Sequence, residues 1–162
     1  MTIYVKNKDT LIIDDFTIKC CVGKNGISSR KKEGDLCTPK GLFNLNKLYF
    51  RKDRVGNIKC KIKKKNIKKN IAWWDDPKNA KYNQEIKTIT KNHKENFYRK
   101  DNKYDYLISI DYNNKNVPNK GSAIFLHLTK NYNPTAGCIA VKKKDFEIIL
   151  KLIDQKTKIK IS

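Results

Sequence analysis

The strongest structural signal in the chain is a two-residue alternation between residues 104 and 112. One set of alternate positions holds only aromatic or β-branched residues: Tyr104, Tyr106, Ile108, Ile110 and Tyr112. Successive side chains of a β-strand point to opposite faces of a sheet, so this period predicts a strand. A second alternating segment, "SAIFLHL" at residues 122–128, places Leu126 and Leu128 on one face and His127 on the other.

A helical pattern stands out near the C-terminus. Apolar residues follow the spacing i, i+3, i+4 and i+7 at Phe146, Ile149, Leu150 and Ile153, with Asp145 near the expected helix start. The closing "KIKIS" predicts a last strand, and alternation from Ile3 to Val22 predicts strands at the N-terminus. Many strands with one helix and no regular βαβ order favour a mainly β or α+β fold, with the C-terminal helix packed before the last strand.

Two polar segments interrupt these patterns. The first, residues 23–45, is a long loop rich in glycine, and long loops in small domains are often functional. The second, "KCKIKKKNIKKN" at residues 59–70, is low in complexity and strongly basic. We interpret it as a solvated edge in which Ile62 and Ile67 anchor a weak strand or turn, and in which the lysines protect the sheet edge from pairing with another chain.

Length and charge limit the class of protein. A chain of 162 residues fits a single domain, 1–162, with a real hydrophobic core. Its 37 Lys+Arg against 16 Asp+Glu give a formal charge of +21, which attracts polyanions such as nucleic acid, acidic lipid or anionic cell-wall polymer. A compositional bias without functional meaning explains the charge equally well.

The sequence also bears on membranes and export. No run of 18 or more apolar residues occurs, so we expect no membrane span. The first 16 residues lack the pattern of a secretory signal, which leaves a cytoplasmic location, another export route or a missing leader open.

Five cysteines are present, an odd number that leaves at least one thiol free. The absence of a CxxC pair and the presence of only two histidines argue against a structural zinc site, so we expect no metal. Cys20, Cys21, Cys37 and Cys60 are expected to be reduced, buried small hydrophobes. Cys138 lies in a different context, in a glycine turn between two apolar runs.

His127 and Cys138 are the candidate catalytic pair. A nucleophilic cysteine needs a base or positive surroundings to supply the thiolate, and His127, at the end of a predicted strand, is a candidate base. Gly137 allows a tight turn in which the N–H groups of Gly137 and Cys138 could face an oxyanion, while Pro134 and Thr135 stiffen its entry. The alternative from composition alone is an inert buried cysteine beside a structural histidine.

The residues around this pair resemble the L,D-transpeptidase catalytic domain, the YkuD family of bacterial cell-wall enzymes. In that family a strand-end histidine precedes a Ser/Thr-x-Gly-Cys turn, which is similar to His127 followed by "TAGC" at residues 135–138. Further similar segments occur in the same order and cover most of the chain: a glycine start with "TPKGLF" at 38–43, "WWDDPKNAKYN" at 73–83, "FYRKDNKYDYLISIDYN" at 97–113 and "GSAIFLHL" at 121–128. The resemblance implies a YkuD-like β-sandwich of mixed sheets.

The resemblance also implies a reaction. Cys138 would attack a diamino-acid carbonyl in a peptidoglycan tetrapeptide stem, expel the terminal D-alanine and form a thioester, with His127 as base. No cofactor is implied. Many family members carry a second histidine where Ala136 stands and Arg or Asn where Ala140 stands, so His127 is left as the base in this chain.

Trp74, Arg99 and Tyr112 complete the candidate set as substrate-binding residues. Trp73 and Trp74 could stack against sugar or peptide, although core packing is the commoner role of such side chains. The Arg99 fork could hold a substrate carboxylate or pair with Asp101 or Asp105. Glu95 and Asp111 are candidates for orienting His127, and His93 is expected to face solvent or anchor a loop.

Two alternatives to a transpeptidase stay open. The first is an L,D-carboxypeptidase or amidase that uses the same thioester but passes it to water. The second is a non-catalytic basic module that binds nucleic acid or anionic wall polymer. Because the tyrosines of residues 104–112 share a face with Ile108 and Ile110, we expect them in the core, which argues against nucleic acid. From the substrate we expect the cell envelope or periplasm as location, and a monomer as the working assumption.

Overall fold

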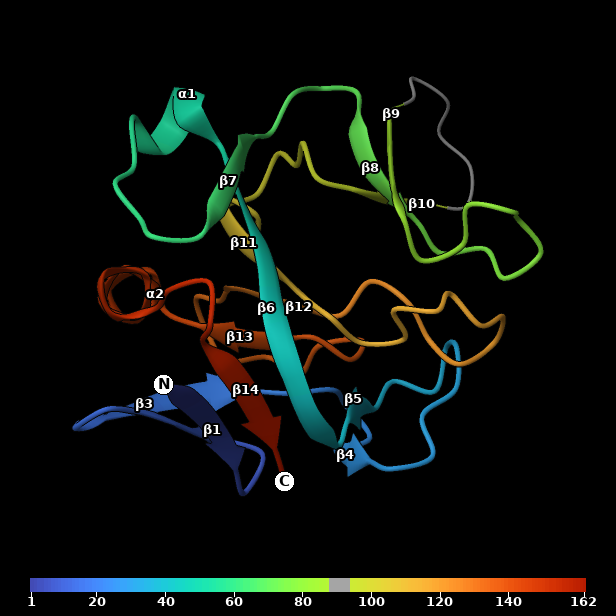
Figure 1. Ribbon diagram of the computed structural model, residues 1–162, viewed down its shortest axis with the longest axis horizontal. Helices are drawn as coiled ribbons and strands as arrows, with labels where there is room; N and C mark the ends of the chain where they lie inside the picture. The colour runs from blue at the N-terminus through green and yellow to red at the C-terminus, as the bar shows by residue number, and fades with distance from the viewer. Residues whose placement is uncertain (88–93) are drawn as a thin grey trace.

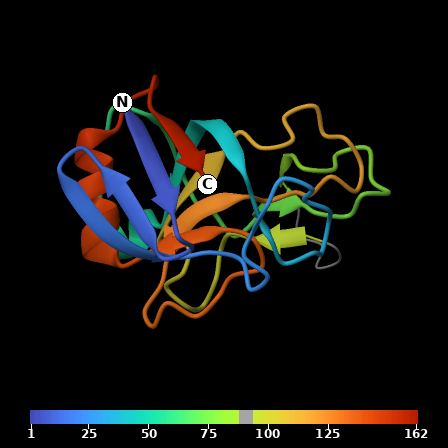
Figure 2. The same ribbon diagram turned by 90° about the horizontal axis from the view of Figure 1, so that it is seen from below.

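The computed structural model describes residues 1–87 and 94–162. Its main element is a nine-stranded sheet in the order β11-β12-β13-β3-β2-β1-β14-β6-β7. The strands are β1 (Thr2–Lys6), β2 (Thr10–Ile13), β3 (Phe16–Cys21), β6 (Gly41–Phe50), β7 (Lys63–Asn66), β11 (Tyr106–Ile110), β12 (Phe125–Leu128), β13 (Ile139–Val141) and β14 (Lys158–Ile161). The first and last strands of the chain, β1 and β14, pair in parallel and lie side by side (Figure 2).

Strand β6 joins the two layers of this sheet. Its first residues pair with β14, from Gly41 opposite Ile161 onward, whereas its second half pairs with β11, ending with Phe50 opposite Tyr106. Figure 1 shows β6 running from the N-terminal strands toward β11 and β7. The sheet therefore folds over on itself through β6, and this confirms the mainly β, sandwich-like architecture expected from the sequence.

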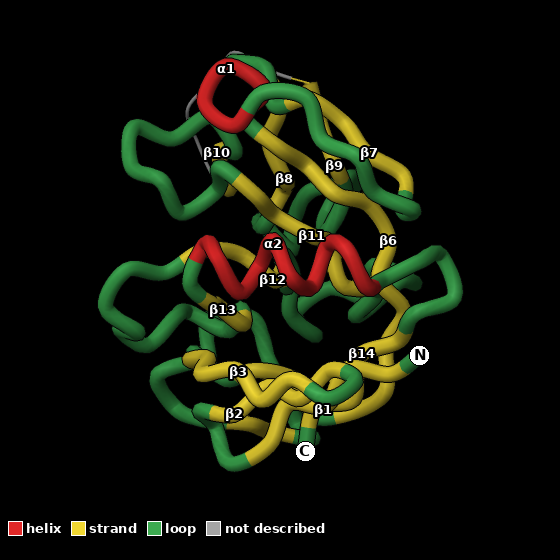
Figure 3. Tube along the Cα trace, turned by 90° about the vertical axis from the view of Figure 1, so that its left-hand side faces the viewer, coloured by secondary structure: helices red, strands yellow, loops and turns green. Residues whose placement is uncertain are grey.

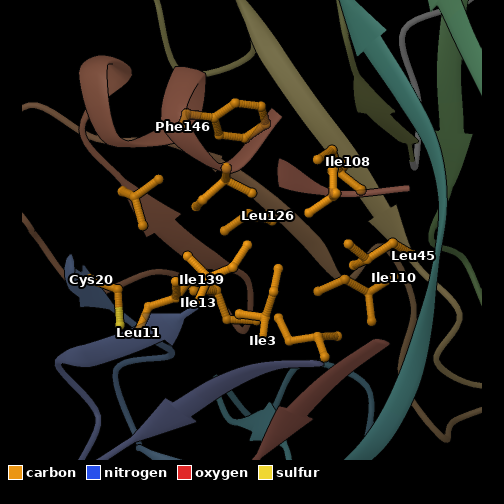
Figure 4. Packing of buried hydrophobic residues seen from close by; sticks show 14 of the residues in the cluster. Ile3, Leu11, Ile13, Cys20, Leu45, Ile108, Ile110, Leu126, Ile139 and Phe146 are labelled. Carbon is orange, nitrogen blue, oxygen red and sulfur yellow. The ribbon is translucent and has the colours of Figure 1, made fainter. Parts of the chain in front are cut away.

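The main hydrophobic core lies between the two layers. Ile3, Leu11 and Ile13 from the N-terminal strands face Ile108 and Leu126 across the core (Figure 4). Helix α2 (Lys143–Leu152) closes one side of the space between the layers (Figure 3). Its Phe146 ring stacks on the Tyr106 ring with a centroid distance of 5.3 Å. The predicted late helix and the last strand are thus confirmed.

Two smaller sheets and one short helix complete the described structure. A three-stranded sheet has the order β10-β8-β9, with β8 (Ile71–Trp74), β9 (Glu85–Lys87) and β10 (Lys94–Asn96), and it lies at the end away from β1 and β14 (Figure 1). Strands β4 (Ile27–Ser28) and β5 (Thr38–Pro39) pair within the long loop, and α1 spans Lys52–Val55. A second buried cluster consists of Tyr49, Ile67, Ile71, Phe97, Tyr104, Leu107, Phe125 and Cys138.

The basic segment has the predicted form. Its strand β7 lies at the end of the nine-stranded order, with Lys63 and Lys64 exposed and with Ile62 and Ile67 buried at either side. Repulsion among exposed lysines discourages this edge from pairing with another chain.

The remaining expectations about cysteines and membranes have these outcomes. All five cysteines are free; Cys20, Cys21 and Cys138 are buried, whereas Cys37 and Cys60 are partly exposed. Within the described ranges, no helix has the length and apolar character needed to cross a bilayer, and no cluster of three or more potential metal ligands occurs. His93 lies outside the described residues.

Candidate active site

Strands β12 and β13 bring the two candidate catalytic residues to one face. The strands pair in parallel, with His127 opposite Ala140 and Leu126 opposite Ile139. Leu126 and Ile139 point into the main core, so the alternation of a strand turns His127 and Cys138 to the other face. Both residues line one pocket of about 760 Å³.

The pocket has walls from three parts of the chain. It is lined by His127, Cys138 and Ala140 of the β12–β13 region, by residues of the loop around Lys31, and by residues from the range 99–105. Both catalytic candidates are nearly covered: His127 is 6% exposed and Cys138 is 8% exposed. Burial of a base and a thiol in one pocket fits a site that excludes water from a reacting acyl group.

His127 is held in one tautomer by its own backbone. Its Nδ1 lies 3.0 Å from the Leu128 carbonyl oxygen, which can only accept a hydrogen bond, so Nδ1 carries the proton. The Nε2 lone pair is therefore free to act as base. Burial is the main cause that lowers the pKa of His127 to about 4; the positive charges of Lys103 and Arg99 act in the same direction, and the Leu128 carbonyl opposes them. The imidazole is thus neutral at pH 7.

Cys138 is a neutral thiol in this structure. Its Sγ donates to the Ala123 carbonyl oxygen at 3.2 Å and accepts from the Phe125 N–H at 3.4 Å. Burial raises the pKa of Cys138 to about 12; Glu95 raises it as well, whereas the Phe125 amide and Lys31 act in the opposite direction. Within residues 1–87 and 94–162 no hydrogen bond joins this sulfur to the His127 ring. The resting pair is therefore a thiol and a neutral imidazole that share a pocket.

The glycine turn before Cys138 is fixed by Thr135. The Thr135 hydroxyl accepts from the Gly137 N–H at 3.1 Å and donates to the Cys138 carbonyl oxygen at 2.6 Å. Gly137 has a φ of +144°, and a Cβ there would lie 2.8 Å from the Cys37 carbonyl oxygen. Only glycine fits such a position.

This turn changes one detail of the sequence interpretation. We expected the amides of both Gly137 and Cys138 to face an oxyanion. Because the Gly137 N–H already donates to Thr135, an oxyanion would have to compete for it. The Cys138 N–H is left as the better placed backbone donor of the two.

Tyr104, Glu95 and Arg99 form a layer beside the catalytic pair. The Tyr104 and His127 rings pack edge to face, with their centroids 5.3 Å apart, and the Tyr104 hydroxyl donates to Glu95 Oε1 at 2.9 Å. Burial raises the pKa of Glu95 despite the opposing effects of the Tyr104 hydroxyl and of Arg99. Glu95 thus contacts the ring that packs on His127 and acts on the imidazole only through it.

Arg99 lines the pocket but is already paired. Its guanidinium forms a two-pronged interaction with Asp101, at 2.9 and 2.7 Å, and also contacts Glu95 at 3.4 Å. Asp105 pairs with Arg54 instead, at 2.9 Å. The ion pair with Asp101 that we gave as an alternative is therefore present, and a carboxylate-binding role for Arg99 stays a prediction.

Three other candidates lie outside the set of residues that line this pocket. The Tyr112 hydroxyl donates to the Lys120 carbonyl oxygen, and its ring meets Phe43 edge-on at 5.6 Å. Asp111 accepts from Asn44. The Trp74 Nε1 is buried and has no hydrogen-bond partner among the residues that the structure describes. The substrate-binding roles of Trp74 and Tyr112 stay predictions without support from the pocket geometry.

Trp73 has the packing role that we considered the commoner one. It stacks on Phe97 at 6.3 Å, meets Phe125 edge-on at 5.4 Å and donates through Nε1 to Asn83. This aromatic packing connects β8 to the face of β12 that carries His127.

Lys31 and Tyr104 line the pocket although the sequence pattern does not identify either as a site residue. Lys31 belongs to a polar loop with no periodic pattern, so nothing in the sequence distinguishes it from its neighbours. Tyr104 begins the alternating segment and was assigned to the core. The available signal for Tyr104 was its position just before β11, the strand that pairs with the His127-bearing strand β12.

Comparisons with known proteins agree with this architecture. The family model "L,D-transpeptidase catalytic domain" (YkuD) matches residues 1–161. Two solved structures are similar: the helical cell shape determining protein Pgp2 from Campylobacter jejuni, with 17% identity and a TM-score of 0.56, and its K307A mutant, with 18% and 0.53. Each alignment covers 99% of this chain and 46% of the other, so the chain spans about half the length of these proteins.

At this identity the two structures support the fold alone. No curated protein matches the chain. The family model, by contrast, covers essentially every residue, including the pocket with His127 and Cys138. The chain therefore belongs to the YkuD family, the L,D-transpeptidase catalytic domains.

Proposed function

We propose that this protein is a cysteine acyltransferase that acts on peptidoglycan stem peptides, with Cys138 as nucleophile and His127 as base. The observation that carries the proposal is the shared pocket, in which a thiol and a tautomer-fixed imidazole are buried on one face of the β12–β13 pair. Membership of a family of peptidoglycan-modifying domains supports the substrate class.

The first half-reaction forms a thioester. The proton of Cys138 Sγ moves to His127 Nε2 as the sulfur attacks the carbonyl carbon of the diamino-acid residue. The C–N bond to the terminal D-alanine then breaks, and its nitrogen takes the proton back from His127. Both side chains are neutral before the reaction. Charge therefore develops in the pocket only while the proton moves from Cys138 to His127.

The second half-reaction decides the product. An acceptor amine that attacks the thioester gives a crosslink between two stems, whereas water gives a shortened tripeptide. In both cases His127 accepts the proton of the attacking group and Cys138 leaves as the thiolate, which takes that proton. The chemistry of the pair is the same for both outcomes. For either one we propose that the protein works in the cell envelope, where this substrate lies.

The test uses purified disaccharide-tetrapeptide and mass spectrometry of the products. The wild-type protein is expected to release D-alanine and to form a crosslinked dimer or a tripeptide, which differ in mass. Cys138→Ser is the matched control, since it changes a single atom of the nucleophile, and it is expected to form neither. Turnover by this variant at the wild-type rate would remove Cys138 from the mechanism.

A further inference from the structure

Lys31 is a buried cation that the sequence pattern did not reveal. Its side chain is 4% exposed, although it belongs to a polar loop whose neighbouring residue, Lys32, is exposed. A lysine is almost never fully buried without a partner, and the partner here is Asp35, at 2.7 Å. The loop thus holds one particular ammonium group inside the pocket.

Two glycines shape the space that Lys31 occupies. A Cβ on Gly121 would lie 3.0 Å from Lys31 Cε, so the stem of the lysine runs closely over that glycine. A Cβ on Gly137 would lie 3.6 Å from Lys31 Nζ, which puts the ammonium beside the turn that carries Cys138. Both glycines have positive φ, of +100° and +144°. The backbone conformation therefore brings the charge up to the nucleophile's turn.

The ammonium retains capacity to donate. Of its three N–H groups, one donates to Asp35 Oδ1 and one to the Lys32 carbonyl oxygen, at 3.2 Å. Asp35 also accepts from the backbone amides of Lys32 and Cys37, at 2.6 and 2.9 Å. Its negative charge is thus shared among three donors and does not belong to Lys31 alone.

The turn at residues 135–138 has few free hydrogen-bond donors that could stabilise a negative charge at Cys138. Thr135 occupies the Gly137 N–H, which leaves one of the two expected backbone donors engaged before any substrate binds. Other charged or titratable groups beside Cys138 are Glu95, Tyr104 and His127, of which Glu95 opposes a negative charge on the sulfur. Lys31 is the cation whose field lowers the pKa of Cys138.

We propose that Lys31 stabilises the negative charge that develops at Cys138, first on the thiolate and then on the oxyanion of the tetrahedral intermediate. The inference rests on the proposed acyl transfer and assigns to it an electrostatic group from the loop around Lys31, which lines the same pocket. Neither bond making nor proton transfer involves Lys31. It contributes a fixed positive charge in a pocket shielded from water, where such charges act most strongly.

The test compares Lys31→Met, which keeps the length of the stem and removes the charge, with Lys31→Arg and with Lys32→Met as the matched control. On the tetrapeptide, Lys31→Met is expected to lower kcat by about 10²-fold with little change in KM. Lys31→Arg is expected to recover a large part of kcat, and Lys32→Met to behave as wild type. Recovery by arginine ties the loss of kcat to the positive charge, and unchanged urea denaturation of Lys31→Met excludes a failure of folding as its cause.

A neutral acyl donor separates this proposal from the proposed function. The rate at which p-nitrophenyl acetate acylates Cys138, corrected with Cys138→Ala, is expected to fall in Lys31→Met to a similar degree. If wild type acylates from the ester but not from the tetrapeptide, the proposed substrate fails while the role of Lys31 stands. If Lys31→Met raises only KM for the tetrapeptide and leaves ester acylation unchanged, Lys31 binds a substrate carboxylate and the proposal is overturned.

Discussion

The two faces of the β12–β13 pair differ in packing and in chemistry. One face carries aliphatic side chains such as Leu126 and Ile139, which are completely buried between the layers of the main sheet. The other face carries Phe125, His127 and Cys138, with aromatic rings as neighbours, and His127 and Cys138 line the pocket. Under the proposed mechanism, adjacent residues of one strand serve stability and reactivity separately, and substitutions on the two faces should have separable effects.

The largest effect is expected on the pocket face. His127→Asn keeps a group that can donate to the Leu128 carbonyl oxygen but removes the basic Nε2. We expect turnover of the tetrapeptide to fall by about 10³-fold, within the range that a general base contributes, and the free energy of unfolding at pH 7 to change little. Steady-state rates and urea denaturation check the two parts. Retention of more than a tenth of the rate would mean that another group is the base.

The neighbouring residue on the core face is expected to show the reverse. Leu126→Ala removes a completely buried side chain and should lower the free energy of unfolding by about 2–5 kcal/mol. Molecules that stay folded should turn over at near the wild-type rate per folded protein, because the pocket face is unchanged. Urea denaturation and active-site titration check this. A loss below 1 kcal/mol would show that the core face is less tightly packed than the structure has it.

Low pH should destabilise the protein through His127. The folded-state pKa of about 4 lies below the ordinary value of 6.5, so the unfolded state binds more protons between these values, and stability falls as the pH drops from about 6.5 toward 4. The loss attributable to His127 is on the order of 3 kcal/mol. Comparison of wild type with His127→Asn isolates it, since Glu95 and other carboxyls contribute equally to both. If the free energies of unfolding of the two proteins fell in parallel from pH 7 to 4, a buried environment that lowers the pKa of His127 would be contradicted.

The smallest effect is expected at the turn between the two faces. Thr135→Val keeps the shape of the side chain but removes the hydroxyl that bonds the Gly137 N–H and the Cys138 carbonyl oxygen. We expect a loss of stability of about 1–2 kcal/mol. Thermal denaturation measures this loss, and Thr135→Ser, which retains the hydroxyl, is the control. Equal stability of the valine and serine variants would show that these two bonds do not hold the turn.

The sequence predicted elements that depend on local pattern. Alternation in residues 104–112 and 122–128 identified β11 and β12, and helical spacing from Phe146 identified α2. The expected core face was correct for Tyr106, Ile108 and Ile110 but wrong for Tyr104, which packs with Leu107 in the second cluster because it precedes β11 and does not follow the alternation of the strand. Strands β8, β9 and β10 are short and carry no comparable alternation. The side chain of Trp73 in β8 packs against Phe97 and Phe125, which come from distant segments of the chain. Their pairing depends on tertiary contacts that a single sequence does not display.

The candidate site could be predicted from the sequence only where its residues belong to a local pattern. The sequence identified His127 and Cys138 as a candidate pair, because His127 ends an alternating segment and Cys138 lies in a glycine turn before an apolar run. That the two side chains share a face depends on the parallel pairing of β12 with β13. The position of Lys31 depends on Asp35 and on two glycines far along the chain, Gly121 and Gly137, and the engagement of the Gly137 amide depends on the rotamer of Thr135. Such features arise only when loops come together in space.

The proposed mechanism requires a covalent bond between the buried Cys138 thiol and its substrate. Intact-protein mass spectrometry of the protein, mixed rapidly with tetrapeptide and quenched in acid, detects such a bond. We expect an added mass equal to the tetrapeptide without its D-alanine, located on the peptide that contains Cys138 and absent from His127→Asn on the same time scale. Product release with the added mass on another residue, or with no adduct at any time during a pre-steady-state burst, would contradict it.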